Sequence, residues 1–167
     1  MLVNTYSKKV FNMAYQFAGS YQEAEDMTQD IFFKLYNSLA KYDSEKNFTA
    51  WLLTLAKNHL IDTYRKTKWE KTNRDEFDEH FLVSEAAESP ESGLVKEANR
   101  RTVWESLNRL SPDIRMAVIL RDIQDKTYEE IAEILNLPLG TVKSRVSRGR
   151  LALAKILQER NEGPDGL

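Results

Sequence analysis

A short stretch near the C-terminal end of the chain combines long cations with small hydroxyl side chains on one helical face. These residues are Lys143, Ser144, Ser147 and Arg148. Long cations reach phosphates and guanine edges, and hydroxyl groups hydrogen-bond to bases and phosphates alike, so this face could read DNA. Another face of the same helix is small or apolar at spacings of four, three and four residues, at Val142, Val146, Gly149 and Leu153, and can pack inward. The alternative is an amphipathic helix with a solvated basic face.

The residues before this stretch predict a helix–turn–helix. Thr127 and Glu130 have the spacing of a capping box, which starts a helix that stops at Asn136. Asparagine tolerates the left-handed backbone conformation that a sharp turn demands. We expect residues 137–140 to form that turn and a final basic helix to begin near Thr141. A basic second helix of this kind is the one that helix–turn–helix proteins insert into the major groove.

The charge of the 167-residue chain is distributed unevenly. Residues 1–68 hold 9 basic and 7 acidic side chains, residues 69–97 hold 3 and 9, and residues 98–167 hold 12 and 10. The formal net charge of −2 therefore conceals an acidic middle between two mildly basic ends. The middle is also rich in Ser and Glu over residues 85–93. Such a composition buries little surface, so it predicts a flexible linker.

Helical spacing recurs along the rest of the chain, and sustained two-residue alternation does not. Gly19 marks the end of a first helix, Ser20 with Glu23 forms a capping box for a second, and a Ser111 side-chain cap followed by Pro112 starts another. The expected helices before the helix–turn–helix cover residues 2–17, 20–39, 48–68, 94–110 and 112–123. The fold class is therefore all-α, with two small helical domains at 1–68 and 98–160, the acidic linker at 69–97 and a tail at 161–167.

Several kinds of chemistry are excluded by what the sequence lacks. It has no cysteine and only 2 histidines, which rules out thiol nucleophiles and thiolate metal sites. His59 and Asp62 are too few ligands for a metal ion, and no catalytic triad or carboxylate cluster stands out. We therefore expect no cofactor, no metal and no enzyme activity. No apolar run has the roughly 20 residues of a membrane span, so we expect a cytoplasmic protein without membrane insertion.

Three segments resemble, in the family's order, the functional parts of bacterial sigma factors. Residues 24–32 (Ala-Glu-Asp-Met-Thr-Gln-Asp-Ile-Phe) resemble their polymerase-binding segment, and residues 48–62 (Phe-Thr-Ala-Trp-Leu-Leu-Thr-Leu-Ala-Lys-Asn-His-Leu-Ile-Asp) resemble their promoter-melting helix. Residues 128–145 are similar to their −35-reading helix–turn–helix. Nearly all of residues 1–160 therefore resembles the extracytoplasmic-function (ECF, group IV) sigma factors of the sigma-70 family. The resemblance implies binding to core RNA polymerase through the β′ clamp helices and the β flap, binding to promoter DNA, and control by an anti-sigma factor.

The face that the resemblance assigns to polymerase binding has a physical rationale. It consists of Asp26, Gln29, Asp30 and Phe33, which share one side of the second expected helix. An acidic and amide patch with one aromatic anchor suits docking on a basic helical partner. The alternative is an ordinary solvated face with one stray Phe. The buried stripe of this helix is expected at Met27, Ile31, Leu35 and Leu39.

The resemblance also assigns two sets of DNA contacts. For the −10 element, one loop and one helix face contribute Tyr42, Asp43, Phe48, Asn58, Asp62, Arg65 and Lys66. A base of that element would be flipped into a loop pocket, where stacking and hydrogen bonds offset the cost of unstacking. For the −35 element, the basic helix contributes Thr141, Lys143, Ser144, Arg145, Ser147 and Arg148. Arg145 and Arg150 are expected at phosphates or in solvent rather than at bases.

Three points stay open at the level of the sequence. Phe48 and Trp51 have a second interpretation as core residues that support the loop. The acidic linker is either a solvated spacer or a segment that runs through the polymerase. A helix–turn–helix repressor or activator that never joins polymerase is the rival function, and it would bind a duplex operator without residues 1–68.

Overall fold

The computed structural model describes residues 2–73 and 94–161, and every regular element in these two ranges is helical, which confirms the all-α fold class. In order, the elements are α1 (Leu2–Ala18), α2 (Tyr21–Ser38), the 3-10 turn η1 (Leu39–Lys41), α3 (Phe48–Asn73), α4 (Leu94–Asn108), α5 (Pro112–Val118), the π-helical turn η3 (Ile119–Ile123), α6 (Tyr128–Leu135) and α7 (Leu139–Asn161). Residues 74–93 of the predicted linker and residues 162–167 of the predicted tail lie outside the described ranges. Both ends of the predicted linker are helical, because α3 continues to Asn73 and α4 begins at Leu94.

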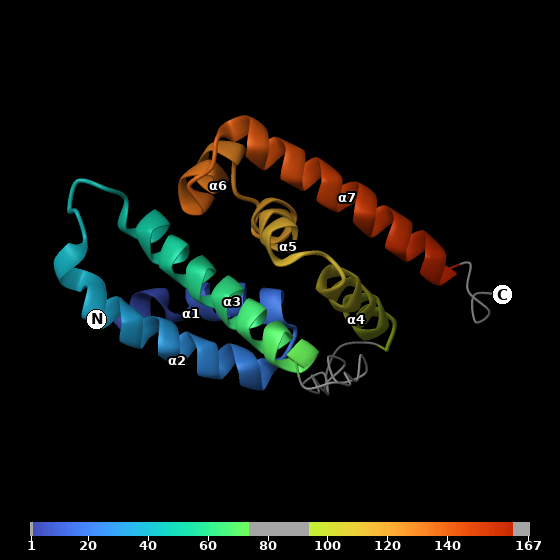
Figure 1. Cartoon of the computed structure of the whole chain (residues 1–167), viewed down its shortest axis with the longest axis horizontal. Coiled ribbons are helices and arrows are strands. Elements are labelled where there is room, and N and C mark those ends of the chain that lie inside the picture. Colours follow the sequence, from blue (N-terminus) through green and yellow to red (C-terminus); the bar gives the residue numbers. More distant parts are fainter. Residues whose placement is uncertain (1, 74–93, 162–167) are drawn as a thin grey trace.

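The first lobe, which we define as α1, α2 and α3, is a bundle in which each helix contacts the other two (Figure 1). Gly19 takes the left-handed φ of +75° that separates α1 from α2, a conformation that costs glycine little. Ser20 then caps α2, because its Oγ accepts a hydrogen bond from the Glu23 N–H at 3.3 Å. The buried apolar side chains of this lobe recur at helical spacing: Val10, Met13, Ala14, Phe17, Ala24, Ile31, Phe32, Leu35, Leu52, Leu53, Ala56, Leu60 and Ile61.

The second lobe, α4 to α7, is organised around the short helix α5, which contacts both α3 and α7 (Figure 1). Pro112 occupies the first turn of α5, as predicted, but the predicted Ser111 side-chain cap is wrong. The Ser111 hydroxyl makes no capping hydrogen bond, and only its carbonyl joins the helix, accepting from the Arg115 N–H at 2.8 Å. The fixed φ of Pro112 is preorganised for the first helical position and favours this start of the helix.

The predicted helix–turn–helix consists of α6 and α7. Its capping box is confirmed in both directions, because the Glu130 N–H donates to Thr127 Oγ1 at 3.1 Å and the Thr127 N–H donates to Glu130 Oε1 at 3.0 Å. Asn136 ends α6 with the predicted left-handed conformation, at φ 54°. The Leu137 N–H donates to the Ala132 carbonyl, five residues earlier, at 3.0 Å. This is the hydrogen bond of a Schellman motif that spans more residues.

The turn of this motif is shorter than the sequence predicts, because α7 begins at Leu139 rather than near Thr141. The Pro138 carbonyl accepts hydrogen bonds from the N–H groups of Thr141 and Val142, at 3.0 and 3.1 Å, and so already starts the helical pattern. Gly140 therefore lies in the first turn of α7 and not in a loop.

Gly149 sets the distance between α5 and α7. It is buried, and a Cβ at this position would lie 2.3 Å from Val118 Cγ2 and 2.9 Å from Ile114 Cγ2. The inward-facing stripe predicted for α7 is confirmed, since Val142 and Val146 are fully buried and Leu153 packs partly buried against them. The glycine is thus needed for close packing, although it weakens the helix itself.

The two lobes pack against each other and share one apolar core. Their contact, which we call the seam, joins α3 to α5 and α6 and joins α1 to α4 and η3. At one end of the seam Trp104 meets Tyr15 edge-on, with 5.9 Å between ring centroids. Between residues 2 and 161, none of the described helices combines the length and the apolar character needed to cross a bilayer.

Candidate functional site

The four residues predicted to bind polymerase lie together on the solvent-facing side of α2. Asp26, Gln29 and Asp30 are exposed, and Phe33 is 70% exposed. Phe32, its immediate neighbour, is buried in the first lobe, so burial does not account for the presence of a phenylalanine at position 33. The predicted stripe is buried at Ile31 and Leu35 and only partly buried at Met27 and Leu39.

Tyr36 enlarges the apolar part of this face. It is 55% exposed and lies three residues after Phe33, so both rings emerge on neighbouring parts of one helix surface. Sequence reasoning missed Tyr36, although its helical spacing from Phe33 was the available signal. The α2 face, defined as Asp26, Gln29, Asp30, Phe33 and Tyr36, therefore offers two aromatic rings bordered by acidic and amide groups.

His59 of α3 lies behind this face. Its Nε2 is 3.7 Å from Asp30 Oδ2 and has no hydrogen-bond partner in the described part of the chain. Burial lowers the pKa of His59, Lys34 lowers it further, and Asp30 and Asp62 oppose the shift. Burial thus favours the neutral imidazole, and the contact of His59 with Asp30 is an ion pair only when His59 is protonated. Within residues 2–73 and 94–161, no group of three or more His, Cys, Asp or Glu side chains could hold a metal ion.

Aromatic side chains support the loop between η1 and α3. The Phe48 ring centroid lies 5.1 Å from that of Tyr6, 5.2 Å from that of Tyr42 and 5.8 Å from that of Trp51. Phe48 and Trp51 are half-buried, which agrees with their interpretation as residues that support the loop. Tyr6 belongs to the same cluster and was not identified from the sequence, because it comes from α1.

Polar groups order the same loop from within. The Tyr42 hydroxyl donates to the Lys46 carbonyl, and Asp43 Oδ1 accepts from the Glu45 N–H at 3.0 Å. Asn47 Oδ1 accepts from the Ala50 N–H at 3.1 Å and thereby caps α3. The loop is thus a preformed element, with Asp43 exposed at its surface.

The predicted −10 face of α3 is exposed along its length. Asn58, Asp62 and Lys66 are open to solvent, whereas Arg65 Nη2 lies 2.6 Å from the Oδ2 atom of Asp113, which belongs to α5. Asp113 is also close to the half-buried Lys57, whose pKa is lowered by burial while Asp113 and Asp62 oppose the shift. The second lobe therefore reaches the cationic end of this face.

The predicted −35 residues lie along the N-terminal half of α7. Lys143, Ser147 and Arg148 are exposed, and Thr141, Ser144 and Arg145 are half-buried. The Arg148 guanidinium donates to Ser144 Oγ from Nε at 3.2 Å and from Nη2 at 2.8 Å, which holds the cation against its own helix.

The cations of α7 differ in their partners within the second lobe. Lys143 Nζ lies 5.8 Å from the ring centroid of Tyr128, on the preceding helix. Arg150 instead donates to both carboxylate oxygens of Asp122, at 3.0 and 2.5 Å, and these hydrogen bonds raise the pKa of Arg150 above its ordinary value. Arg150 therefore faces η3, whereas Lys143 and Arg148 are exposed and form no ion pair within the described part of the chain.

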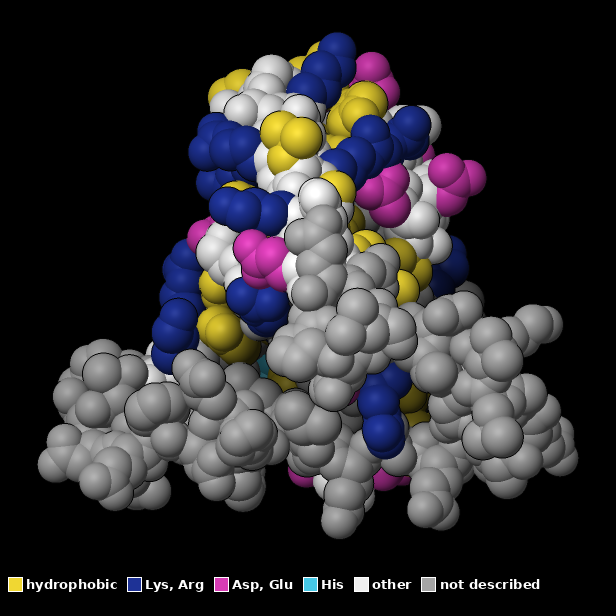
Figure 2. Space-filling view, turned by 90° about the vertical axis from the view of Figure 1, so that its right-hand side faces the viewer, with side chains coloured by type: hydrophobic (Ala, Val, Ile, Leu, Met, Phe, Trp, Pro, Cys, Tyr) yellow, Lys and Arg dark blue, Asp and Glu magenta, His cyan; other side chains and the backbone are white. Residues whose placement is uncertain are grey.

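The molecule also exposes cations and apolar side chains beyond the predicted sites. Seen from the right-hand side of Figure 1, its upper part carries many Lys and Arg side chains, with hydrophobic side chains and some Asp and Glu side chains among them (Figure 2). Leu151 of α7 is 70% exposed. A surface of this composition can contact both a polyanion and a protein.

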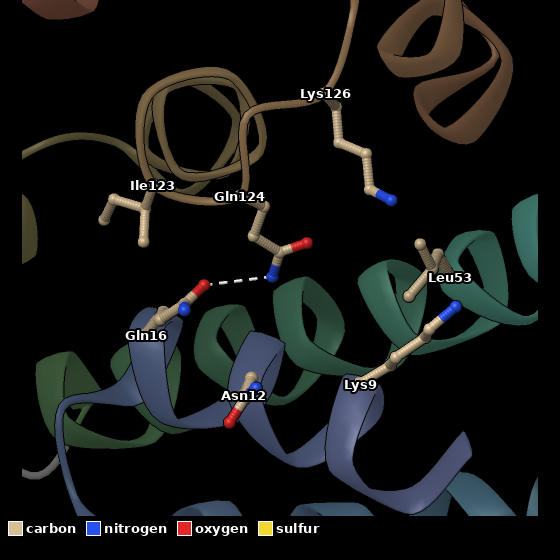
Figure 3. A pocket seen from close by; sticks show the side chains of 7 residues that line it. All are labelled: Lys9, Asn12, Gln16, Leu53, Ile123, Gln124 and Lys126. Carbon is tan, nitrogen blue, oxygen red and sulfur yellow. Dashed lines mark hydrogen bonds between the residues drawn. The ribbon is translucent and has the colours of Figure 1, made fainter. Parts of the chain in front are cut away.

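A groove of about 270 Å³ crosses the seam (Figure 3). Lys9, Asn12 and Gln16 line it from α1, Leu53 from α3, and Ile123, Gln124 and Lys126 from η3 and the loop after it. Gln124 Nε2 donates to Gln16 Oε1 at 2.9 Å and so bridges the two lobes. The groove exists only while the lobes are together, because both lobes supply its walls.

Sequence comparisons assign each lobe to a known family. Sigma-70 region 2 matches residues 2–70, and Sigma-70, region 4 matches residues 100–153. The RNA polymerase sigma-H factor of Pseudomonas aeruginosa is 33% identical over 164 residues, which span 95% of this chain and 85% of that protein. The ECF RNA polymerase sigma factor SigW of Bacillus subtilis is 31% identical over 173 residues, spanning 95% and 88%.

Solved structures show the same fold. The sigma factor RpoE from Bartonella quintana, in a co-crystal with the anti-sigma factor NepR, superposes with a TM-score of 0.73 at 29% identity, over 93% of this chain and 94% of that one. CnrH, in complex with the cytosolic domain of CnrY, superposes with a TM-score of 0.66 at 22% identity, over 94% and 85%.

A helical, two-lobed transcription factor with a DNA-reading helix–turn–helix is the class that this fold and these faces define. The chain belongs to the extracytoplasmic-function sigma factors of the sigma-70 family. Its function is promoter-directed transcription initiation through RNA polymerase. The rival function as an independent repressor is not favoured, because a region 2 module is present beside the helix–turn–helix.

Proposed function

We propose that the α2 face binds core RNA polymerase, that α3 and the loop before it bind and open the −10 element, and that α7 reads the −35 element. The observation that carries this proposal is the exposure of Phe33, whose ring is 70% exposed on the α2 face while Ile31 and Phe32 beside it are buried. A rigid helix that exposes an aromatic anchor within acidic groups is suited to a basic protein partner.

The β′ clamp helices and the β flap are the proposed partner surfaces on polymerase. Burial of the Phe33 ring alone would contribute about 1.5–3 kcal/mol to the free energy of binding. Ion pairs of Asp26 and Asp30 with basic side chains of the partner would fix the position of α2 along that surface. All five residues of the α2 face are exposed in the described part of the chain while the lobes are packed together. The α2 face is therefore free to bind polymerase with the lobes together.

The −10 assignment rests on a preformed loop beside an exposed polar helix face. The ordered loop, with Tyr42, Asp43 and Phe48, offers ring faces and a carboxylate near its surface, which are the groups that hold a flipped base. Asn58, Asp62, Arg65 and Lys66 continue from it along α3. An amide and two cations can bind bases and phosphates, and Asp62 can accept from a cytosine amine.

The −35 assignment rests on the orientation of α7. Lys143 and Arg148 are exposed next to Ser144 and Ser147, and Thr141 lies in the first turn of the helix. The short hydroxyl side chains allow the helix backbone to approach the groove, while the cations reach base edges and phosphates. Arg145 would meet a phosphate from the side of the helix.

The same proposal includes what surrounds these contacts. The protein makes and breaks no covalent bond itself, and it acts in the cytoplasm, where RNA polymerase and the chromosome are found. RpoE of Bartonella quintana is held by an anti-sigma factor, and we propose that a protein of this kind also controls the present chain. The two functional modules are residues 1–68 and 98–160, and the acidic residues between them connect the modules along the polymerase.

The test is capture of core RNA polymerase by the tagged chain. Asp26→Arg combined with Phe33→Ala should abolish capture, because the double variant loses the aromatic anchor and reverses one charge of the α2 face. Helicity should be unchanged, since both side chains are exposed.

Glu133→Arg is the matched control. Glu133 is an exposed acidic residue of α6 and lies outside the α2 face. Its charge reversal should leave capture within about two-fold of the parent chain. Retained capture by the double variant, or equal loss in both variants, would remove the α2 face from the polymerase site.

A further inference from the structure

One buried cation holds the seam together. Arg115 of α5 is 1% exposed, and its Nη1 donates to the Phe17 carbonyl of α1 at 3.1 Å. Its Nη2 donates to the carbonyls of Asn108 and Leu110, both at 3.2 Å. The guanidinium also lies 4.6 Å from the ring centroid of Phe17 and 4.7 Å from that of Tyr64. Arg115 therefore bridges the two lobes through hydrogen bonds and ring contacts.

These contacts have a specific role at helix ends. Phe17 lies in the last turn of α1, and Asn108 is the last residue of α4. Carbonyls at such ends have no partner within their own helix and favour a cation. In the opposite direction, the Thr54 hydroxyl of α3 lies 2.8 Å from the Ile134 carbonyl in the last turn of α6, and it shares its single hydrogen between that carbonyl and the Ala50 carbonyl of its own helix, also at 2.8 Å. Each lobe thus completes a helix end of the other.

The seam also engages the arginines to which we have assigned DNA contacts. Asp113 of α5 has its Oδ2 2.6 Å from Arg65 Nη2 and its Oδ1 3.9 Å from Arg145 Nη1. Arg65 is a −10 residue and Arg145 a −35 residue in the proposed function. An anion with two oxygens directed at two guanidinium groups presents the chemistry of a backbone phosphate. A DNA phosphate at either arginine would compete with Asp113.

We propose that the face of the first lobe formed by Phe17, Thr54, Tyr64 and Arg65 is a docking surface for the second lobe of the same chain, and that Asp113 takes there the place of a DNA phosphate. Promoter binding then requires the lobes to separate. This inference rests on the proposed DNA contacts of Arg65 and Arg145. The docked lobes leave the α2 face exposed, so polymerase can bind first and promoter DNA afterwards.

Docking is measured directly in the free, full-length chain. The sequence has no cysteine, so Lys8→Cys on α1 and Ala154→Cys on α7 allow a donor and an acceptor dye to be attached at exposed positions. We expect high energy transfer from single molecules at low salt. Asp113→Arg replaces attraction to Arg65 by repulsion and should lower the ratio of docked to separated molecules by about five-fold or more, since loss of one exposed ion pair alone gives up to about five-fold.

Asp122→Arg is the matched control. Asp122 forms an exposed ion pair of the same kind, but with Arg150 inside the second lobe. Its reversal should leave energy transfer unchanged. Low transfer in the parent chain, or the same transfer in both variants, would overturn the inference. Arg115 itself is unsuitable for this test, because it also binds the C-terminal end of α4 and the loop that follows, within its own lobe.

A covalent lock links docking to function. Gln16 and Gln124 are hydrogen-bonded across the seam, so Gln16→Cys with Gln124→Cys can be bridged by a short bismaleimide. With core polymerase, the bridged protein should lose transcription from a promoter that the unbridged double variant transcribes. Full transcription by the bridged protein would overturn the inference. If the unbridged protein fails to transcribe while energy transfer responds as expected, the lobes dock and the proposed function is wrong.

Discussion

Gly149→Ala tests whether close packing at α7 positions the DNA-reading helix. The added Cβ would lie 2.3 Å from Val118 Cγ2 and 2.9 Å from Ile114 Cγ2, both on branched side chains of α5. Carbon atoms in contact are normally about 3.5–4.0 Å apart. Because two neighbours approach the methyl group, α5 and α7 must move apart for the variant to fold.

Two opposing effects set the magnitude. Ala is favoured over Gly in a helix interior by about 0.8–1 kcal/mol. Overpacking of a well-packed site costs about 1–3 kcal/mol, and a contact shortened by more than 1 Å belongs in the upper half of that range. The free energy of unfolding should therefore fall by about 1–2 kcal/mol, which corresponds to about 2–4 °C of Tm per kcal/mol for a chain of this size.

Gly140→Ala provides the comparison within the same helix. A Cβ at Gly140 would meet no atom within 4 Å, so only the propensity gain remains, and the variant should be equally stable or more stable by up to about 1 kcal/mol. Urea unfolding followed by far-UV circular dichroism measures both variants. A Gly149→Ala protein as stable as Gly140→Ala would refute the argument that α5 and α7 require glycine at their crossing.

Two further expectations concern DNA binding and pH. Lys143→Ala and Arg148→Ala should each weaken binding to a −35 duplex by about 1–3 kcal/mol if the side chain contacts a base. If it contacts a phosphate, each should lower the slope of log affinity against log salt concentration by about one. Fluorescence anisotropy at two salt concentrations separates the cases, with Lys155→Ala at an exposed position as the control, and unchanged binding at both concentrations would exclude the residue. Because burial lowers the pKa of His59 below its ordinary 6.5, the unfolded chain takes up the proton first, so its contribution to stability is complete above about pH 6.5 and is lost as the pH falls through the lowered folded-state pKa. The urea midpoint of the parent chain should therefore decline more between pH 7.5 and pH 5.5 than that of His59→Gln; identical declines would show that His59 does not contribute.

Local signals in the sequence predicted most of the helices. The capping box of Thr127 and Glu130, the left-handed Asn136 and the glycine after α1 depend only on neighbouring residues, and the structure confirms them. The Ser111 side-chain cap was wrong because Pro112 starts α5 without it. The start of α7 was misplaced by two residues. The sequence does not reveal whether the Pro138 carbonyl accepts its hydrogen bonds from residues of a turn or from the first residues of the helix.

The seam could not be predicted, because it depends on residues far apart in the chain. Arg115 and Phe17 are separated by 98 positions, and Thr54 and Ile134 by 80. One signal was present and was not used: Arg115 is the single charged residue in the otherwise apolar run from 114 to 120. A cation in such a run has to find acceptors inside the protein, and here the acceptors are helix-end carbonyls.

The exchange of helix ends between lobes has a consequence for engineered chimeras. Arg115 provides α1 with its terminal partner, and Thr54 does the same for α6, so neither half is structurally self-sufficient at these points. Grafting the helix–turn–helix of one relative onto the N-terminal half of another would leave these carbonyls without their matched donors unless both sides of the junction are transplanted together. Faster amide hydrogen exchange at the last turns of α1 and α6 would be the first sign of such a mismatch, even in a hybrid that still recognises its promoter.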